Sequence, residues 1–361
     1  MIRILHVVTF MGRGGLETML MNYYRNIDRT KIQFDFLVHR DFRADYDDEI
    51  ESLGGIIHRI PRLVPWSPNY RKALNAFFKT HPEYRIVHVH QDCLSSIICK
   101  AAKKCGVPVR IAHSHSNSQD KNIKYPIKSF YKRFIPKYAT HLFACSESAG
   151  SWMFGNHKFE ILPNAINTDL YKYNSVTANT IRESFGIGKD EMLIGHVGRF
   201  EPPKNHTFLI DVFFELQKNV KAKLILVGDG YLRKSIEQKV TSLNILDKVI
   251  FTGIRNDVHN LLQAMDVFVF PSLYEGFPVT LLEVQSSGLP CVISDRVDDV
   301  CKLTEQVHHV SLNNSIEEWI KAIISCNNKQ RSVYSNIIAE KGYDISSCSD
   351  MLCDFYLENW N

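Results

Sequence analysis

The chain has 361 residues, of which 45% are hydrophobic and 23% charged, a composition that excludes a disordered or fibrous protein and predicts two or three globular domains. No apolar run approaches the about 18 to 20 residues of a membrane-spanning helix, and residues 1–8 lack the architecture of a signal peptide, so the sequence excludes an integral membrane protein and predicts a cytoplasmic one. The net charge of +4 is unevenly divided: residues 1–165 carry 24 basic and 14 acidic side chains and residues 166–361 carry 19 and 25, which predicts two domains with different partners.

Short β-branched runs, each followed by a helical pattern, fill the first half of the chain. The expected strands are residues 4–8, 32–38, 56–60, 86–90, 109–112 and 141–144, where the series is expected to end. The expected helices are residues 16–27, 45–53, 70–78, 94–105 and 123–138. Strands that alternate with helices form right-handed crossovers, and these predict a parallel sheet covered on both faces.

A second series of the same kind follows a predicted linker that includes the polar residues 174–180. Its expected strands are residues 192–197, 224–227, 249–252, 267–270 and 291–293, and residues 345–360 are expected to form a last helix. The sequence therefore predicts two successive doubly wound α/β domains. Ligands of such sheets bind at the carboxyl ends of the strands, so the default site is the cleft between the domains.

The first strand is followed by a glycine-rich turn that contains Gly14 and Gly15. Glycine lets a ligand approach the backbone, and the next helix offers unpaired amides to a phosphate. The turn is therefore equally compatible with phosphate binding and with a purely structural tight turn. The spacing matches neither the dinucleotide fingerprint nor the P-loop.

Two His-x-His pairs lie at the ends of expected strands: His88 with His90, and His113 with His115. A metal site would also need carboxylates nearby, and the candidates are Asp92 and Asp120. We expect no metal; one histidine of the second pair is expected to face the cleft and the others to be structural. The nine cysteines form no Cys-x-x-Cys pair, so they are expected to be reduced, mostly buried thiols.

The loop after the first strand of the second half carries Arg199 and Lys204 immediately before a helix. An arginine and a lysine at a helix N-terminus suit a pyrophosphate, although a solvated charged loop is the simpler interpretation. A later loop, Gly228-Asp229-Gly230, is compatible with a purely structural role.

The most informative stretch places Glu275 in a loop and Glu283 about a turn and a half into the next helix, which is expected to begin at Pro278. Carboxylates accept hydrogen bonds, so the two glutamates suit the hydroxyl groups of a ribose and a hexose. The loop with Arg199 and Lys204 would then bind the phosphates that link the ribose to the hexose.

These features together resemble the large retaining glycosyltransferases of the GT4 type, which have the GT-B fold of two Rossmann-like domains facing a cleft. The resemblance covers almost the whole chain and is carried by Gly14-Gly15, His113-Ser114, Pro163-Asn164, Gly198-Arg199 with Lys204, Gly228-Asp229-Gly230, Phe251-Thr252-Gly253-Ile254 and the Glu-x7-Glu pair from Glu275 to Glu283. The Glu-x7-Glu stretch is specific, and the glycine loops are not. The members that the chain most resembles act in bacterial capsule, exopolysaccharide or lipopolysaccharide assembly.

The resemblance implies a role for each of these positions. Residues 1–165, with a C-terminal helix at 345–361 that returns to them, would form the acceptor-side domain, and residues 166–344 would bind the nucleotide sugar. The implied catalytic residues are His113, Glu275, Arg199 and Lys204. The implied donor-binding residues are Gly14, Gly15, Arg199, Lys204, Gly253, Ile254, Arg255, Glu275, Gly276, Phe277, Pro278 and Glu283. Neither a metal nor another cofactor is implied.

The sequence departs from the family pattern in two places. Asn205 stands where many relatives carry glycine, and the segment from Ser294 to Asp299 lacks the glycines expected beside the sugar pocket. A hydrolase triad is excluded because no Gly-x-Ser-x-Gly elbow is present.

We therefore predict a cytoplasmic, metal-independent, retaining glycosyltransferase that moves a hexose or N-acetylhexosamine from a UDP-sugar to a saccharide or lipid-linked acceptor. The alternative is a UDP-sugar epimerase of the same two-domain fold. A nucleic-acid-binding protein is disfavoured because no recognised motif accompanies the basic charge. The basic segment 121–137 suggests a peripheral contact with the anionic inner face of the cell membrane, or else a solvated helix.

Overall fold

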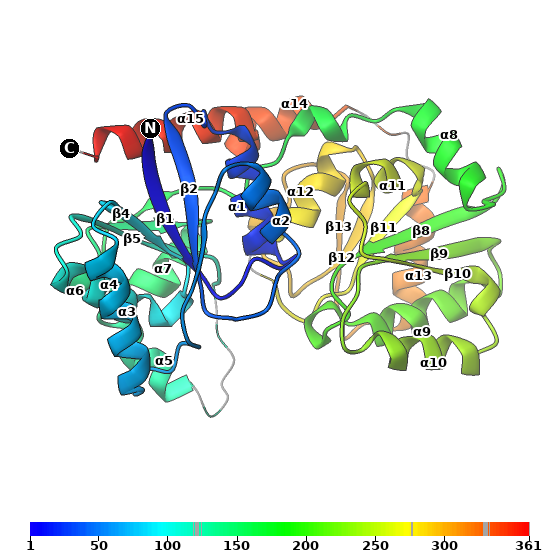
Figure 1. Ribbon diagram of the computed structural model, residues 1–361. Helices are drawn as coiled ribbons and strands as arrows, with labels where there is room; N and C mark the ends of the chain where they lie inside the picture. The colour runs from blue at the N-terminus through cyan, green and yellow to red at the C-terminus, as the bar shows by residue number, and fades with distance from the viewer. Residues whose placement is uncertain are drawn as a thin grey trace. The chain divides into compact units, whose positions relative to one another are not determined.

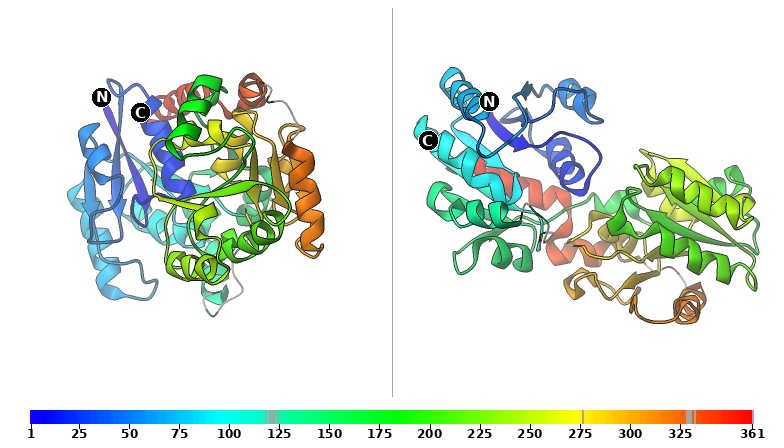
Figure 2. Two further views of the ribbon diagram at one scale, coloured as in Figure 1. Left: turned by 90° about the vertical axis from the view of Figure 1, so that its right-hand side faces the viewer. Right: turned by 90° about the horizontal axis from the view of Figure 1, so that it is seen from below.

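A computed structural model describes residues 1–117, 119, 123, 125–275, 277–327, 331 and 333–360 of the chain. They form two compact units: unit 1 comprises Met1–Ala165 and Ile345–Asn361, and unit 2 comprises Ile166–Asp344. Each unit has one parallel sheet with helices on both faces, which Figures 1 and 2 show from three sides. The predicted class, two parallel α/β domains, is confirmed.

The sheet of unit 1 has seven strands in the order β3-β2-β1-β4-β5-β6-β7. The strands are β1 (Ile2–Val8), β2 (Ile32–Val38), β3 (Ile57–Arg59), β4 (Ile86–Val89), β5 (Val109–Ser114), β6 (His141–Ala144) and β7 (Glu160–Ile161). The helices are α1 (Gly15–Asn26), α2 (Asp47–Ser52), α3 (Pro68–Thr80), η1 (Asp92–Leu94), α4 (Ser95–Lys104), α5 (Tyr125–Lys132), α6 (Ile135–Tyr138), α7 (Glu147–Phe154) and α15 (Ile345–Glu358). Every residue of β2 is buried, as a strand covered on both faces requires.

Two groups of helices cover this sheet. Helix α15 packs on α1, and its Tyr356 is fully buried, with its hydroxyl 2.7 Å from Nδ1 of His88 on β4. Helix α4 contacts α3, α5 and α6, which lie together in Figure 1. The last helix of the chain therefore completes the core of unit 1.

The sheet of unit 2 has six strands in the order β10-β9-β8-β11-β12-β13. The strands are β8 (Met192–Val197), β9 (Ala222–Val227), β10 (Val249–Gly253), β11 (Val267–Phe270), β12 (Cys291–Ser294) and β13 (Val307–Val310). The helices are η2 (Thr168–Tyr171), α8 (Ser175–Ser184), η3 (Pro202–Lys204), α9 (His206–Leu216), α10 (Arg233–Ser242), η4 (Leu246–Lys248), α11 (Val258–Ala264), α12 (Val279–Ser286), η5 (Asp299–Cys301), α13 (Ile316–Asn327), α14 (Ser335–Ile338) and η6 (Ala339–Tyr343).

Both sheets reverse their strand order beside the first strand. In unit 1 the chain moves outward from β1 to β3 and then returns to β4 on the other side of β1. In unit 2 it does the same, with β9 and β11 on either side of β8. Such a switch point leaves a crevice at the carboxyl ends of the two strands, because their loops turn away in opposite directions.

Four expectations about the elements were wrong. The first series does not end at residue 144, because α7 and β7 follow; β7 has two exposed residues and so no apolar pattern. Strand β13, the sequence Val-His-His-Val, was missed for a similar reason, since three of its four residues are only partly buried.

The predicted linker at 174–180 is the start of helix α8. The Asn174 side chain caps this helix by accepting hydrogen bonds from the backbone amides of Val176 and Thr177. Ala178 is the one fully buried residue described in α8, so the helix lacks the apolar stripe that would have identified it.

The helix expected at 123–138 is two helices, α5 and α6. Pro126 is the second residue of α5 and Pro136 the second residue of α6, positions at which the missing amide costs no hydrogen bond. None of the helices in the described ranges is both long and apolar enough to span a bilayer. The nine cysteines form no disulfide with one another, and seven of them are buried, in agreement with the predicted burial.

Candidate functional site

The switch point of unit 2 brings together two of the predicted site residues. Lys204 ends η3 in the loop after β8, and Glu275 lies in the loop after β11. The Lys204 Nζ donates to Glu275 Oε1 at 2.5 Å, and the two side chains are only 19% and 15% exposed. The Lys204 ammonium also lies 4.6 Å from the centre of the Phe270 ring. The structure therefore forms a sheltered ion pair at the place where the topology predicts a ligand.

Two backbone contacts fix these loops against each other. The Asn205 side-chain amide donates to the carbonyl of Pro271 at 3.1 Å, and the amide of Leu273 donates to the carbonyl of Pro203 at 2.8 Å. Asn205 itself has φ 54° and ψ 42°, the left-handed region that glycine and asparagine tolerate best. The asparagine thus adopts a backbone conformation that glycine also tolerates, and its side chain ties the two loops together.

The Gly228-Asp229-Gly230 loop has a structural role. A Cβ on Gly228 would lie 2.2 Å from the carbonyl oxygen of Gly198, and φ at Gly228 is +134°. The amide of Phe200 donates to the carbonyl of Asp229 at 3.0 Å. The loop therefore supports the segment that carries Arg199. Arg199 lies 3.5 Å from Glu201 and is 41% exposed, so the structure does not place it in the Lys204–Glu275 pair.

Glu283 lies on α12, inside unit 2, where it accepts a hydrogen bond from the hydroxyl of Tyr171 at 2.7 Å. Burial raises the pKa of the Glu283 carboxyl above its usual value, and the Tyr171 hydroxyl partly offsets this. Tyr171 was missed because it lies just before residues 174–180, in the segment that was interpreted as a linker. The structure does not pair Glu283 with Glu275.

The other predicted donor residues line the same end of unit 2. Phe277 stacks on Tyr343 with ring centres 5.1 Å apart, and Pro278 precedes the first residue of α12 as predicted. Gly253 has φ +69°, Ile254 is half exposed, and Arg255 pairs with Asp257 at 2.7 Å. Gly276 lies outside the described residues.

The segment after β12, which departs from the family pattern, contacts the Glu275 loop. Val297 forms a parallel bridge with Glu275, and the Ser294 hydroxyl donates to the carbonyl of Ser272 at 2.5 Å. The segment therefore supports Glu275 through its backbone without the expected glycines.

In unit 1, Gly14 and Gly15 lie at the start of α1, at the carboxyl edge of the sheet. Gly14 is the N-cap residue, and a Cβ built on Gly15 would meet no atom within 4 Å. Packing against the described residues therefore does not require a glycine at position 15.

The two His-x-His pairs and His6 form a continuous cluster across β1, β4 and β5. The His6 Nδ1 lies 3.1 Å from Nε2 of His90, whose Nδ1 lies 2.9 Å from Nε2 of His115. The rings of His113 and His115 are 4.0 Å apart. His113 is only 2% exposed and His115 is partly exposed.

These imidazoles are neutral near pH 7. Burial holds the pKa of His88, His90 and His113 well below the usual value, and the repulsion that a protonated ring would meet from a second protonated histidine lowers it further. Burial lowers the pKa of His6 to about 3. Asp92, a predicted supporting carboxylate, lies 3.3 Å from Lys128 instead, and Asp120 lies outside the described residues.

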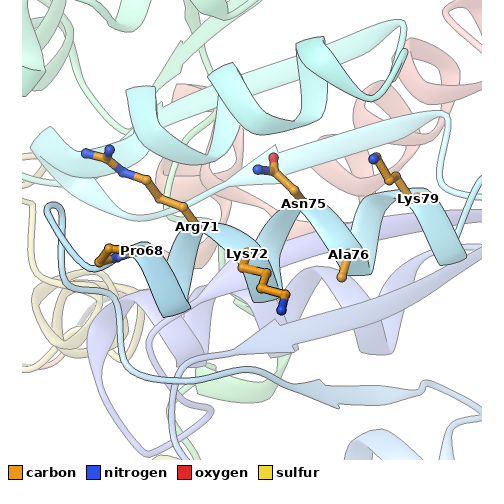
Figure 3. Close-up of a pocket in the computed structure, with 6 residues that line it drawn as sticks. All are labelled: Pro68, Arg71, Lys72, Asn75, Ala76 and Lys79. Atoms are coloured by element: carbon orange, nitrogen blue, oxygen red, sulfur yellow. The ribbon is translucent and has the colours of Figure 1, made fainter.

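A shallow concavity lies away from these groups, on helix α3 of unit 1 (Figure 3). Arg71, Asn75 and Lys79 follow one another at intervals of four residues along one side of the helix. With Lys72 they make the lining basic.

Two family models match the chain. The model described as Glycosyltransferase Family 4 matches residues 13–170, and the model described as Glycosyl transferases group 1 matches residues 177–341. Neither model supports the epimerase alternative.

Two relatives and one solved structure agree with these matches. The putative glycosyltransferase EpsF of Bacillus subtilis is 38% identical over 98% of this chain and 96% of its own length. An Escherichia coli protein, named as a UDP-Gal:alpha-D-GlcNAc-diphosphoundecaprenol alpha-1,3-galactosyltransferase, is 27% identical over 76% of each chain. The crystal structure of Anabaena HepE in complex with UDP and glucose aligns with a TM-score of 0.80 at 18% identity, covering 98% of this chain and 99% of that one. The predicted GT-B fold is confirmed.

The neutral histidine cluster predicts a loss of stability in mild acid. The unfolded chain binds protons near pH 6.5 and the folded cluster does not, so stability is present above that pH and falls below it, by up to about 1.4 kcal/mol per pH unit for each buried histidine. Urea unfolding followed by circular dichroism should show a lower midpoint at pH 5.5 than at pH 7.5.

Replacing His6 by phenylalanine should reduce that difference, and replacing the exposed His157 should not. Equal midpoints at the two pH values would show that the cluster is protonated in the folded chain.

Proposed function

We propose a function from one premise: this chain belongs to the glycosyltransferases that combine a family 4 segment with a group 1 segment. Its reaction is the transfer of a hexose or N-acetylhexosamine from a UDP-sugar to a saccharide or lipid-linked acceptor, with retention of the anomeric configuration, in the synthesis of a bacterial surface polysaccharide. The observation that carries the proposal is the Lys204–Glu275 pair at the switch point of unit 2. The UDP donor and diphospholipid acceptor in the E. coli relative's name support it.

The ion pair is suited to a ligand that carries both phosphates and hydroxyl groups. A buried charge that loses its partner is costly, so a ligand that separates Lys204 from Glu275 must supply a new partner to each. A nucleotide sugar does this: its diphosphate accepts from the Lys204 ammonium, and a sugar hydroxyl donates to the Glu275 carboxylate. The pair thus holds the two side chains in place until the donor replaces the contact between them.

The same charges would favour departure of the diphosphate. Lys204 stands two residues before α9, so its ammonium and the positive end of that eleven-residue helix both act on the leaving group. Arg199, in the same loop, adds a second cation. The bond from the sugar to the diphosphate breaks and the bond to the acceptor oxygen forms on the same face, with the acceptor proton passing to the departing phosphate oxygen. No metal is needed for this charge balance.

The remaining residues position the ends of the donor. Glu283 would accept from the ribose hydroxyls in exchange for Tyr171, and Gly253, Ile254 and Arg255 would bound the base. From unit 1, Gly14 and Gly15 would approach the diphosphate, and His113 would line the sugar pocket.

A basic surface on unit 1 suits an acceptor that stays in a membrane. Helices α3, α4, α5 and α6 carry nine lysines and arginines and no acidic residue. Among them, Lys79, Lys103 and Lys104 are exposed. We propose that this surface binds anionic lipid at the inner face of the cell membrane, each exposed cation contributing about 1 kcal/mol.

The segment first assigned to this contact, 121–137, has a smaller part in it. Lys128 is paired with Asp92, and the Lys132 Nζ donates to the carbonyl of Trp152 at 2.7 Å. Lys121 and Lys124 lie outside the described residues.

The reaction itself is tested with a panel of UDP-sugars and a diphospholipid-linked saccharide. UDP should be released when the acceptor is present, and nuclear magnetic resonance of the product should show the anomeric configuration of the donor. Conversion of the UDP-sugar without UDP release would indicate an epimerase, and an inverted product would contradict a retaining mechanism.

The first prediction concerns the leaving group. Lys204→Ala should lower kcat by about 10²- to 10³-fold, because it removes a positive charge needed as the diphosphate departs. The matched control is Lys234→Ala, an exposed lysine of α10, which should not change kcat. An unchanged kcat in Lys204→Ala would remove this residue from the mechanism.

The second prediction separates the two glutamates by calorimetry with UDP, which has no hexose. Glu283→Gln should weaken UDP binding about tenfold or more, since it removes a charged acceptor for the ribose hydroxyls. Glu275→Gln should not weaken UDP binding, because UDP takes the Lys204 ammonium without giving Glu275 a new partner, and it should abolish most transfer. Equal UDP affinities in the two variants would contradict the assigned positions of hexose and ribose.

The third prediction concerns the membrane. Sedimentation with liposomes should require anionic lipid and weaken with salt, and it should drop in the triple variant Lys79→Glu, Lys103→Glu, Lys104→Glu. The control variant, Lys189→Glu, Lys221→Glu, Lys234→Glu, makes the same change of charge on exposed lysines of unit 2. Equal loss in both variants would mean that total charge, not this surface, governs binding.

A further inference from the structure

The histidine cluster of unit 1 has a property that glycosyl transfer does not use. Three imidazoles, those of His90, His113 and His115, offer ligand atoms that all lie within 4.8 Å of one another. His90 directly follows β4, and His113 and His115 lie at the end of β5, which pairs with β4. The group therefore lies at the carboxyl edge of the sheet, where ligands of parallel sheets bind.

Two of the ring nitrogens are separated almost as metal ligands are, and a turn of the rings would direct both lone pairs at one ion. Nδ1 of His90 and Nε2 of His115 point at each other across 2.9 Å, and two zinc-bound imidazole nitrogens in a tetrahedral site stand about 3.3 Å apart for Zn–N bonds of about 2.0 to 2.1 Å. A metal ion could replace the shared proton after that turn and a movement of a few tenths of an ångström.

A partner outside this group fixes one of the rings. The other nitrogen of His90, Nε2, contacts Nδ1 of His6 at 3.1 Å. Neither nitrogen of His113 makes a hydrogen bond with a described residue, although the backbone of Leu162 lies close enough to favour its protonation slightly. A ring nitrogen held by a backbone or side-chain partner, with the second directed at the metal, is the usual arrangement of zinc-binding histidines.

We propose that His90, His113 and His115 form a binding site for a divalent transition metal of the zinc class. Three neutral imidazoles suit Zn²⁺, Co²⁺, Ni²⁺ or Cu²⁺ and do not suit Mg²⁺ or Ca²⁺, which prefer oxygen ligands. Three protein ligands leave a fourth position for water or a substrate group.

The neighbouring group of His6, His88 and His90 is a weaker candidate. Its ligand atoms also lie within 4.8 Å of one another, but all three side chains are buried. His115, in contrast, is partly exposed and gives an ion a route of entry.

Occupation of the site is expected to inhibit transfer. This consequence rests on the proposed function, in which His113 lines the sugar pocket, because an ion bound to that ring would occupy the space of the sugar. Metal binding itself does not depend on the proposed function, so the two can fail separately.

The test uses the full chain with any affinity tag removed and with metals stripped by a chelator. Zinc is titrated against a chromogenic chelator, and one equivalent should bind at micromolar or lower concentration. Cobalt should give the visible bands of a tetrahedral site without the charge-transfer band of a thiolate, which separates the histidines from the nine cysteines.

The decisive variant is His115→Ala, whose fold is checked by circular dichroism. It should weaken zinc binding at least about tenfold, abolish the cobalt bands and keep transfer activity in the presence of zinc. His157→Ala, an exposed histidine of the same unit, should behave as the wild type does.

Three outcomes would overturn the proposal: no stoichiometric zinc binding, zinc binding unchanged by His115→Ala, or a cobalt spectrum typical of thiolate ligands. Each would leave the cluster as a neutral hydrogen-bonded chain. Zinc binding without inhibition would keep the site and contradict only the placement of His113 in the sugar pocket.

Discussion

The reversal of strand order beside β8 is the constraint on which the candidate site depends. It places the loops after β8 and β11 next to each other and so brings Lys204 within 2.5 Å of Glu275, a residue 71 positions away in the sequence. Two further features hold these loops in place. Gly228 has no side chain to clash with the backbone of Gly198, and Asn205 adopts the left-handed conformation that precedes α9. A sheltered lysine and glutamate are stable there because each neutralises the other, and under the proposed function the phosphate and a hydroxyl group of the donor take the place of these partners.

The two units use the same sheet order for different chemistry. At the switch point of unit 2 the side chains are charged, whereas the carboxyl edge of unit 1 holds neutral imidazoles whose pKa values are lowered by burial. Neutral rings can be buried together at modest cost, and their unpaired nitrogens remain available to a proton or a metal ion. Nine lysines and arginines lie instead on helices α3 to α6 of unit 1, which carry no acidic residue. Cationic side chains and buried neutral imidazoles thus lie on different elements of the same unit.

The sequence predicted four strands with their observed bounds, residues 32–38, 141–144, 192–197 and 267–270, and all but the second of them contain buried β-branched residues. It missed β7 and α8, because exposed residues carry no periodic pattern. Glu275, Lys204 and Glu283 were identified from their spacing and the family resemblance. Their partners were not: Tyr171 lies beside a misread linker, and the contact of His6 with His90 requires the order of β1 and β4, which no local pattern reveals.

The central claim is that the switch point of unit 2 binds the nucleotide sugar by exchanging the Lys204–Glu275 contact. A crystal structure of the chain with UDP and a non-reactive UDP-hexose analogue tests it most directly. In this complex we expect the diphosphate to accept a hydrogen bond from the Lys204 Nζ and a hexose hydroxyl to donate to Glu275. The distance between the two side chains should then exceed hydrogen-bonding range. Analogue density elsewhere, with the 2.5 Å contact intact, would contradict it.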